Sequence, residues 1–395
     1  MKKQVCNIYI ALWCLYNLQG TLYSSGSVIS RVLLAILLMV SIYYFLFANN
    51  RYKIPNVLKM LSCLILIWTI YGVIHIVFGN GGRSYIYLKN IYCALLPVFP
   101  FYVFAKQGQL NESVIRRWGV VFLFIGIAQF YRFRREELAA IAEAGGSSEE
   151  TTNNMGYVLL SLLPLLPLYY KKPIVQYAIM GICMIYVLLG MKRGAIIIGI
   201  IALLWLFYVQ NITHRKSNKQ LLRNLLTIVL LVLAVYYFQK LLVSSDYFNA
   251  RLEQTLEGDS SGRDRIYGNL LNGYLSETNP FLFVFGNGAV ATYRLYGVYA
   301  HNDWLEIAIN NGFWMIVLYL IYWIVMFKTL RKSKKNTTCY LILSLFFIIY
   351  FAKSFISMSY SAIQIYSTCP LGFALATYLD TGSYTESKED DSFGS

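Results

Sequence analysis

One histidine stands where the chain passes from a polar segment into an apolar run. His301 follows a Tyr-rich stretch, and it is followed by Asn302 and then by apolar residues from Trp304 to Phe327. An imidazole has an unperturbed pKa near neutrality, which suits it to take a proton as a general base. We therefore interpret His301 as a candidate base at the mouth of a membrane helix.

Two segments far from His301 in the sequence could bind an anion. Lys192 and Arg193 lie in a tight turn between two apolar runs, and Arg263 and Arg265 lie two positions apart in a long polar segment. A guanidinium group binds phosphate oxygens with two parallel hydrogen bonds. On local sequence alone, Arg193 could instead be an interfacial residue that closes a turn. Arg263 could instead form a salt bridge within its loop, and both alternatives stay open at this point.

Other polar residues near these candidates also have a structural alternative. Asn302 or Asp303 can cap a helix that begins here, and Glu306 follows Asp303 by three residues, as in a capping box. Asn154 precedes another apolar run, where it is either an N-cap or an amide that binds sugar. We include Asn302, Glu306 and Asn154 as candidate substrate-binding residues.

The composition indicates that these residues belong to a membrane protein. Hydrophobic residues make up 57% of the chain and charged residues only 13%, whereas soluble domains contain about 25% charged residues. Apolar runs of helical length recur along the sequence, which predicts an all-α, polytopic membrane fold. The net charge of +15 comes mostly from short segments between these runs, so it indicates topology and not nucleic-acid binding.

We predict a single transmembrane domain, residues 1–379, with about twelve helices. The predicted spans are 5–22, 28–47, 57–78, 85–105, 116–131, 154–170, 174–191, 194–210, 222–243, 303–327, 338–356 and 360–379. Basic residues concentrate in alternate connections, which places both termini in the cytoplasm by the positive-inside rule. We interpret the acidic, Ser-rich segment 380–395 as a disordered cytoplasmic tail.

The predicted topology leaves two long segments on the outer face. These are 132–153, whose first half has a helical pattern, and 244–302, the largest extramembrane segment. We expect a surface helix within Glu253 to Asn272, entered through the turn at 258–262. Lys192, Arg193, Arg263 and His301 all fall on this face.

Metal-dependent chemistry is not expected. The outer segments contain no Asp-x-Asp pair and no HExxH motif, and the seven cysteines form no CxxC pair. The other two histidines, His75 and His214, we interpret as incidental. We predict no cofactor, so arginine would have to neutralise the charge that Mg²⁺ neutralises elsewhere.

The chain resembles the O-antigen ligase and polysaccharide polymerase superfamily of bacterial inner-membrane proteins. The similarity covers roughly residues 150–330, and its order, spacing and common membrane face make it specific. The residues on which it rests are Asn154-x-Gly156, Lys192-Arg193-Gly194-Ala195, Ser261-Gly262-Arg263, Gly286-Asn287-Gly288, His301-Asn302-x-x-Leu305-Glu306 and Gly312. One position departs from the pattern, because Lys192 stands where many relatives have a small residue.

This resemblance implies a metal-independent membrane glycosyltransferase that uses glycans linked to undecaprenyl diphosphate. Carried onto this sequence, Arg193 and Arg263 would bind the donor diphosphate, with Arg265 as a helper. His301 would take the proton from the acceptor hydroxyl or orient it. The implied partners are the lipid-linked oligosaccharide, the lipid bilayer and a chain-length regulator.

Three activities remain open at this point. We favour a repeat-unit polymerase, because nothing in the sequence indicates a lipid A-core acceptor. The first alternative is an O-antigen ligase that transfers glycan to lipid A-core. The second is a flippase of lipid-linked oligosaccharide, which predicts internal repeats and charges at the bilayer midplane.

Overall fold

The described part of the molecule is built from helices. The computed structural model describes residues 2–22, 27–78, 82–143, 154–213, 220–244 and 262–390, together with the single positions 249 and 253. Within these ranges there is no β-strand. The predicted all-α class is confirmed for this part of the chain.

The helices follow one another with short connections. In chain order they are α1 (Lys2–Leu22), α2 (Val28–Arg51), α3 (Asn56–Phe78), α4 (Gly82–Leu95), α5 (Val98–Lys106), α6 (Glu112–Glu143), α7 (Met155–Leu160), the 3₁₀ helix η1 (Leu163–Tyr169), α8 (Pro173–Leu189), α9 (Arg193–Thr213), α10 (Gln220–Ser244), α12 (Arg263–Leu275), α13 (Pro280–Phe285), α14 (Ala291–Tyr296), α15 (Asp303–Asn311), α16 (Phe313–Lys332), the 3₁₀ turn η2 (Ser333–Lys335), α17 (Thr337–Ile356) and α18 (Ile365–Asp390).

Eight helical segments in the described residues are long and apolar enough to cross a membrane. They are Val28–Arg51, Asn56–Phe78, Arg83–Lys106, Glu112–Glu143, Arg193–Thr213, Gln220–Tyr237, Phe313–Lys335 and Thr337–Ile356. The chain is therefore a multi-pass membrane protein. The predicted spans 5–22, 154–170, 174–191 and 360–379 are not among the eight, so the count of about twelve stays a prediction.

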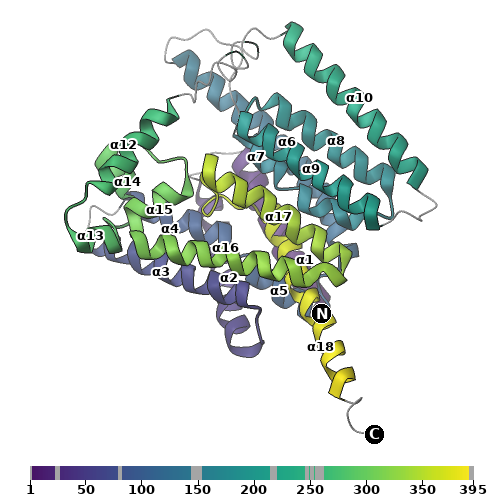
Figure 1. The fold of residues 1–395 in the computed structure, drawn as a ribbon, viewed down its shortest axis with the longest axis horizontal. Coiled ribbons are helices and arrows are strands. Elements are labelled where there is room, and N and C mark those ends of the chain that lie inside the picture. The colour runs from purple at the N-terminus through teal and green to yellow at the C-terminus, as the bar shows by residue number, and fades with distance from the viewer. Residues whose placement is uncertain are drawn as a thin grey trace.

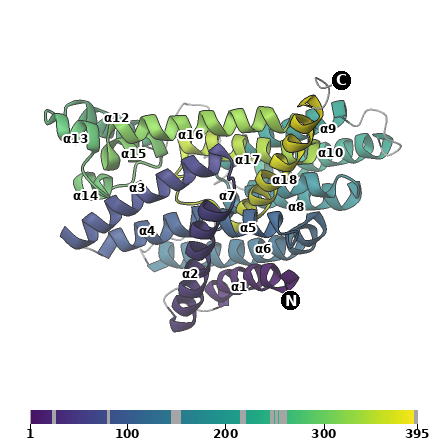
Figure 2. The same ribbon diagram turned by 90° about the horizontal axis from the view of Figure 1, so that it is seen from below.

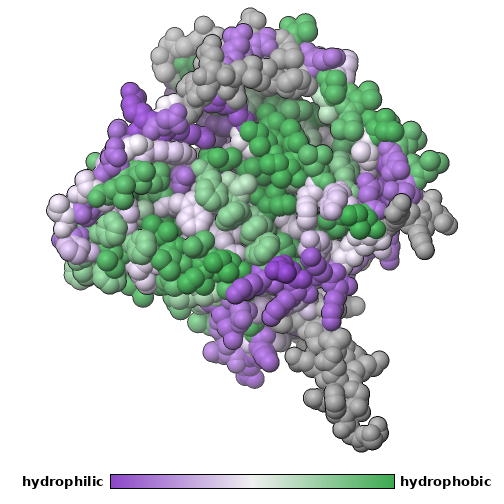
Figure 3. Space-filling model, in the orientation of Figure 1, coloured by the Kyte–Doolittle hydropathy of each residue, from purple (hydrophilic) through white to green (hydrophobic). Residues whose placement is uncertain are grey.

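The layout separates a bundle of long helices from a group of short ones. Figures 1 and 2 show α12, α13, α14 and α15 together at one end of the molecule, where the end of α3 also lies. The long helices α16 and α17 lead away from this group, and α18 packs against α5 and α17. Figure 3 shows hydrophobic side chains over the middle of one face, with hydrophilic ones gathered at its lower edge and upper left.

The predicted helix 303–327 is wrong as a single element, because it is interrupted at Gly312. The chain forms α15 up to Asn311 and then α16 from Phe313. Gly312 has a φ of 79°, a conformation that a helix interior does not allow and that favours glycine. The residue before α16 therefore turns the chain, and α15 becomes a separate short helix that presents His301 and Asn302 at its start.

A second glycine explains why the chain turns there. Gly286, with a φ of 76°, packs directly on the backbone of Asn311 and Gly312. A Cβ atom on Gly312 would in turn collide with the carbonyl group of Val284. The two backbones are in direct contact, and a side chain at either glycine would push them apart.

Hydrogen bonds close the same contact. The backbone N–H groups of Asn287 and Gly288 donate to the carbonyl oxygens of Ile309 and Asn310, both at 2.9 Å. These bonds satisfy carbonyl oxygens at the C-terminal end of α15, where no following turn supplies N–H donors. The Gly286-Asn287-Gly288 motif therefore fixes α15, and with it the position of His301.

Other predicted elements differ in extent from the observed ones. The span 154–170 is α7 followed by η1, which contains Pro164 and Pro167. The span 85–105 is divided into α4 and α5 at Pro97. The helical first half of 132–153 continues α6 to Glu143.

Two further segments lie partly outside the described residues. The expected surface helix within 253–272 is α12, which begins at Arg263. Most of the turn at 258–262 lies outside the described residues, as do 391–395. The helical backbone of α18 continues to Asp390, into the segment for which the sequence predicts disorder.

Candidate functional site

One cavity brings together five of the predicted site residues. It has a volume of about 510 Å³ and lies among α7, α9, α12, α17 and the segment before α15. The predicted residues that line it are Asn154, Lys192, Arg193, Arg263 and His301. Its lining also includes Tyr157, Ile266, Lys353, Ser357, Met358 and Gln364. The structure thus places the two arginine segments and the histidine around one space, although they are far apart in the sequence.

Three predicted site residues do not line this cavity. Arg265 lies two positions into α12 and outside the lining. Asn302 is the N-cap of α15, and its side-chain oxygen accepts from the N–H groups of Trp304 and Leu305 at 2.9 and 3.2 Å. Its amide nitrogen donates to the carbonyl of Phe355 at 2.9 Å. Both ends of the Asn302 side chain therefore bind the protein itself.

Glu306 is buried and is also engaged with the protein. Its carboxylate accepts from the backbone N–H of Ala300 at 2.9 Å, from the side-chain amide of Asn310 at 3.0 Å and from the hydroxyl of Thr292. The capping residue is Asn302, and Glu306 reaches back past it to Ala300. Glu306 consequently holds the chain that leads into His301 and does not face the cavity.

His301 adopts an unusual backbone conformation between these two anchors. Its φ is 50°, in the left-handed region, and its carbonyl accepts from the hydroxyl of Tyr267 at 3.1 Å. Left-handed backbone in a non-glycine residue costs about 1–3 kcal/mol and is maintained only where the surroundings impose it. Here the cap by Asn302 and the bond from Ala300 to Glu306 impose it on either side.

The environment of His301 favours its neutral form. The side chain is solvent-accessible, but the cavity wall removes part of its hydration, and this lowers its pKa below 6.5. The positive charges of Arg263 and Lys192 lower the pKa further. A neutral imidazole at pH 7 can accept a proton, as a general base must.

Arg193 and Lys192 are presented by a tight turn. α8 ends at Leu189, and Met191 adopts a φ of 50° before α9 begins at Arg193. Arg193 is therefore the first residue of a helix of 21 residues. The N-terminal end of such a helix carries a partial positive charge, which adds to the attraction for an anion.

Arg263 links α12 to the end of α17. Its guanidinium donates to the carbonyl of Ile356 at 2.8 Å. Because Ile356 is the last residue of α17, this bond satisfies one of the carbonyls that a helix end leaves without a partner. Arg263 and the end of α17 therefore form one wall of the cavity.

Lys353 is a fourth cation of this cavity, and the sequence-based prediction missed it. Its side chain is 5% exposed, and its ammonium lies 5.1 Å from the ring centroid of Tyr157. A single lysine inside the apolar helix 338–356 was the available signal, because a charge in a membrane helix is costly unless it is used. The prediction passed over it because the surrounding run is otherwise apolar.

Asp303 supports the site from within the protein. It is fully buried, and it accepts from the hydroxyl of Tyr319 at 2.7 Å and from the N–H groups of Ser359 and Tyr360 at 2.7 and 3.2 Å. Burial raises the pKa of Asp303 to about 7, and these hydrogen bonds and the charge of Lys353 oppose the rise. Asp303 thus connects the start of α15 to the segment after α17.

The charge of the cavity is one-sided. Lys192, Arg193, Arg263 and Lys353 line it, and none of the lining residues that the structure describes is an aspartate or a glutamate. Such a site attracts a ligand with more than one negative charge. Comparison of the sequence with protein-family models and with curated proteins finds no match.

Proposed function

We propose that this protein is a polysaccharide polymerase of the bacterial inner membrane. It would transfer a glycan from undecaprenyl diphosphate to the sugar of another lipid-linked repeat unit on the periplasmic face. The observation that best supports this proposal is one cavity in which four cationic side chains surround a neutral histidine, with no acidic side chain among its described lining residues.

The four cations suit the leaving group of this reaction. When the bond between the anomeric carbon and the diphosphate oxygen breaks, negative charge grows on the diphosphate. Arg193, Arg263, Lys192 and Lys353 would stabilise that charge without a metal ion. A preorganised donor of this kind is typically worth about 3–4 kcal/mol of transition-state stabilisation.

His301 would act on the acceptor. Its neutral imidazole takes the proton of the acceptor hydroxyl while the hydroxyl oxygen forms a bond to the anomeric carbon of the donor. The products are the elongated lipid-linked glycan and free undecaprenyl diphosphate, and the proton remains on His301 until it passes to solvent. A base of this kind typically contributes about 10²–10⁴-fold in rate.

The orientation of the molecule agrees with a periplasmic site. A separate cavity is lined by Lys53, Lys59, Lys328 and Lys332, which lie just before and at the start of α3 and at the end of α16. The candidate site lies at the other end of α17, where that helix ends at Ile356. Basic segments tend to remain in the cytoplasm, which supports a candidate site on the opposite, periplasmic face.

Purified protein in lipid nanodiscs tests the proposal directly. With a lipid-linked repeat unit as the only glycan, we expect a ladder of longer products. We expect Arg193→Ala and His301→Ala to abolish the ladder while protein levels stay normal. Arg265→Ala is the matched control, because Arg265 is on the same face but outside the cavity, and this variant should retain the ladder.

Two other outcomes would replace the proposal. Transfer to lipid A-core, without polymerisation, would identify a ligase with the same site. Movement of the lipid-linked glycan from one leaflet of a vesicle membrane to the other, without any new glycosidic bond, would identify a flippase. A His301→Ala variant that forms normal ladders would remove His301 from the reaction.

A further inference from the structure

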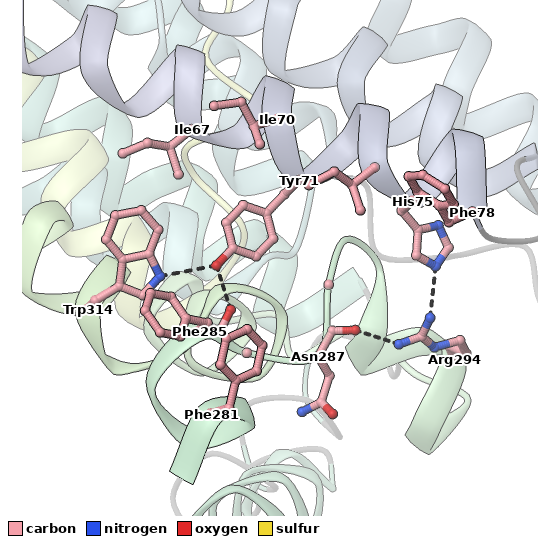
Figure 4. A pocket seen from close by; sticks show the side chains of 13 residues that line it. Ile67, Ile70, Tyr71, His75, Phe78, Phe281, Phe285, Asn287, Arg294 and Trp314 are labelled. Carbon is pink, nitrogen blue, oxygen red and sulfur yellow. Dashed lines mark hydrogen bonds between the residues drawn. The ribbon is translucent and has the colours of Figure 1, made fainter. Parts of the chain in front are cut away.

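A second cavity lies on the same end of the molecule and shares no lining residue with the first. Its volume is about 580 Å³, and it lies between α3 and the segment that includes α13, the Gly286-Asn287-Gly288 motif and α14 (Figure 4). One end of the cavity is apolar and the other is polar. Nothing in the proposed transfer reaction uses it.

The apolar part is open toward the outside of the helix bundle. Its walls include Ile74, which is 53% exposed, and Phe281, which is 65% exposed. Because α3 is long and apolar enough to span the membrane, exposed apolar residues on it face hydrocarbon. The apolar part is therefore a groove that an acyl chain can enter from the side.

Aromatic groups with fixed positions form the deeper wall of this groove. The indole of Trp314 donates to the hydroxyl of Tyr71 at 3.1 Å, and that hydroxyl donates to the carbonyl of Phe285 at 2.6 Å. Figure 4 shows these groups at one side and the charged end of the cavity at the other. These two hydrogen bonds hold the aromatic groups in place, so binding would require little reorganisation.

The polar end is organised around Arg294. Its guanidinium donates to the imidazole Nε2 of His75 at 2.8 Å and to the carbonyl of Asn287 at 2.6 Å (Figure 4). Because Nε2 accepts this bond, His75 is neutral, and its Nδ1–H donates to the hydroxyl of Ser84. These bonds hold the guanidinium at the rim while other N–H donors of the group remain for a ligand. His75, which the sequence analysis treats as incidental, is thus part of a site.

We propose that this groove binds an anionic phospholipid of the surrounding bilayer. The acyl chain lies along Ile74, Phe281 and Trp314, and the phosphate binds Arg294. Within the described part of the chain, no lining residue is acidic, so an ammonium-bearing headgroup would find no partner for its positive charge. The site therefore selects a headgroup of the phosphatidylglycerol type over a zwitterionic one.

The charge of the second cavity also favours a phospholipid over the lipid-linked donor as its ligand. Counted over the residues that the structure describes, the first cavity offers four cationic side chains and the second offers one, Arg294. A diphosphate carries more negative charge than one guanidinium can neutralise, whereas a phosphodiester carries a single charge. The groove thus matches a phospholipid, and this assignment does not depend on the proposed transfer reaction.

Photoactivatable phospholipids with a diazirine on the acyl chain test the assignment. The full-length protein is placed in nanodiscs with trace probe, either phosphatidylglycerol or phosphatidylcholine, and labelled peptides are identified by mass spectrometry. We expect the phosphatidylglycerol probe to label peptides containing Phe281 or Trp314 about fivefold more than the phosphatidylcholine probe. A basic residue at a membrane surface changes the association of anionic lipid by about this factor.

Matched variants separate a selective site from ordinary contact with the bilayer. Arg294→Gln should remove the preference for phosphatidylglycerol, and Arg294→Lys should retain part of it because the charge remains. Ile74→Trp, a change at an exposed position, should reduce labelling by filling the groove. Arg265→Gln should leave labelling unchanged.

Three results would overturn the proposal. The first is equal labelling by both probes in the wild-type protein. The second is a preference that survives Arg294→Gln. The third is displacement of the phosphatidylglycerol probe by undecaprenyl diphosphate at lower concentrations than by unlabelled phosphatidylglycerol, which would assign the groove to the isoprenoid lipid.

Discussion

Replacing Lys353 by methionine should have opposite effects on the stability of this protein and on its proposed activity. The side chain is 5% exposed and lines the candidate cavity, with its ammonium 5.1 Å from the centroid of the Tyr157 ring. The described residues contain no ion pair that includes Lys353. Methionine has a similar length and no charge, so Lys353→Met removes the ammonium and keeps most of the packing.

We expect the variant to be more stable than the wild type. A buried charge without a close partner loses hydration, and burying a polar group without a compensating hydrogen bond typically costs about 1–3 kcal/mol, a cost that an apolar replacement removes. Here the gain should be near the lower limit, about 1 kcal/mol, because the ring of Tyr157 and the charge of Asp303 attract the ammonium. Thermal unfolding in detergent, followed by tryptophan fluorescence, should show a rise of roughly 2 °C in the apparent midpoint.

The same change should slow glycan transfer. If the ammonium stabilises the departing diphosphate, its loss should reduce kcat by about 10²–10³-fold, as removal of one preorganised donor typically does. The assay is single-turnover conversion of lipid-linked donor in nanodiscs. Lys328→Met is the control, because Lys328 is exposed at the far end of α16 and lies outside the cavity. This control should change neither the rate nor the midpoint.

Two results would refute this reasoning. An unchanged rate in Lys353→Met would show that the ammonium does not meet the leaving group. A lower midpoint would show that the attraction between Lys353 and Asp303 outweighs the loss of hydration, so the lysine would be a structural partner of the buried carboxylate.

Three further predictions follow from the same geometry. Arg263→Ala should reduce the rate of glycan transfer by about 10²–10³-fold. Arg265→Ala should leave this rate within about twofold of wild type, since only Arg263 lines the cavity. Comparable losses in both variants would mean that the cavity does not define the site. In the pH profile of kcat/KM, the apparent pKa of the acid limb should lie below 6.5, because burial and nearby cations lower the pKa of His301. Arg263→Gln removes one of these positive charges and should raise that apparent pKa. An unchanged apparent pKa would assign the acid limb to another group. Gly312→Ala should abolish folded protein in detergent chromatography, because its Cβ would collide with the neighbouring backbone at a positive φ; Gly268→Ala, in a helix with open space around the glycine, should be tolerated or raise stability by about 0.5–1 kcal/mol.

Several features of the fold could be predicted from the sequence because they depend on local pattern. Long apolar runs must be helical in lipid, where every backbone polar group needs a partner within its own segment. The cap at Asn302 is likewise set by neighbouring residues. The candidate arginines and the histidine could also be identified, because a charged side chain or an imidazole at the edge of an apolar run can be recognised from the sequence alone.

Features that depend on contacts between distant segments could not be predicted. The segment 303–327 is largely apolar, a pattern that predicts one helix, but Gly286 packs against its backbone at Gly312 and divides it. Hydropathy indicates whether a residue prefers water or an apolar environment. It does not indicate which distant segment of the chain packs against that residue. For the same reason Glu306, which looked like a substrate ligand, is buried in a structural role.

The candidate cavity likewise combines features that follow from the sequence with features that only tertiary packing determines. By itself the sequence determined the class of the protein, the residue types available for anion binding and the local caps that present them, since each follows from neighbouring residues. Only the tertiary structure decided that Arg193, Arg263 and His301 surround one space, that Lys353 joins them and that Arg265 does not. Convergence is a property of packing, because helices with similar apolar surfaces can assemble in many ways until specific backbone contacts and hydrogen bonds select one.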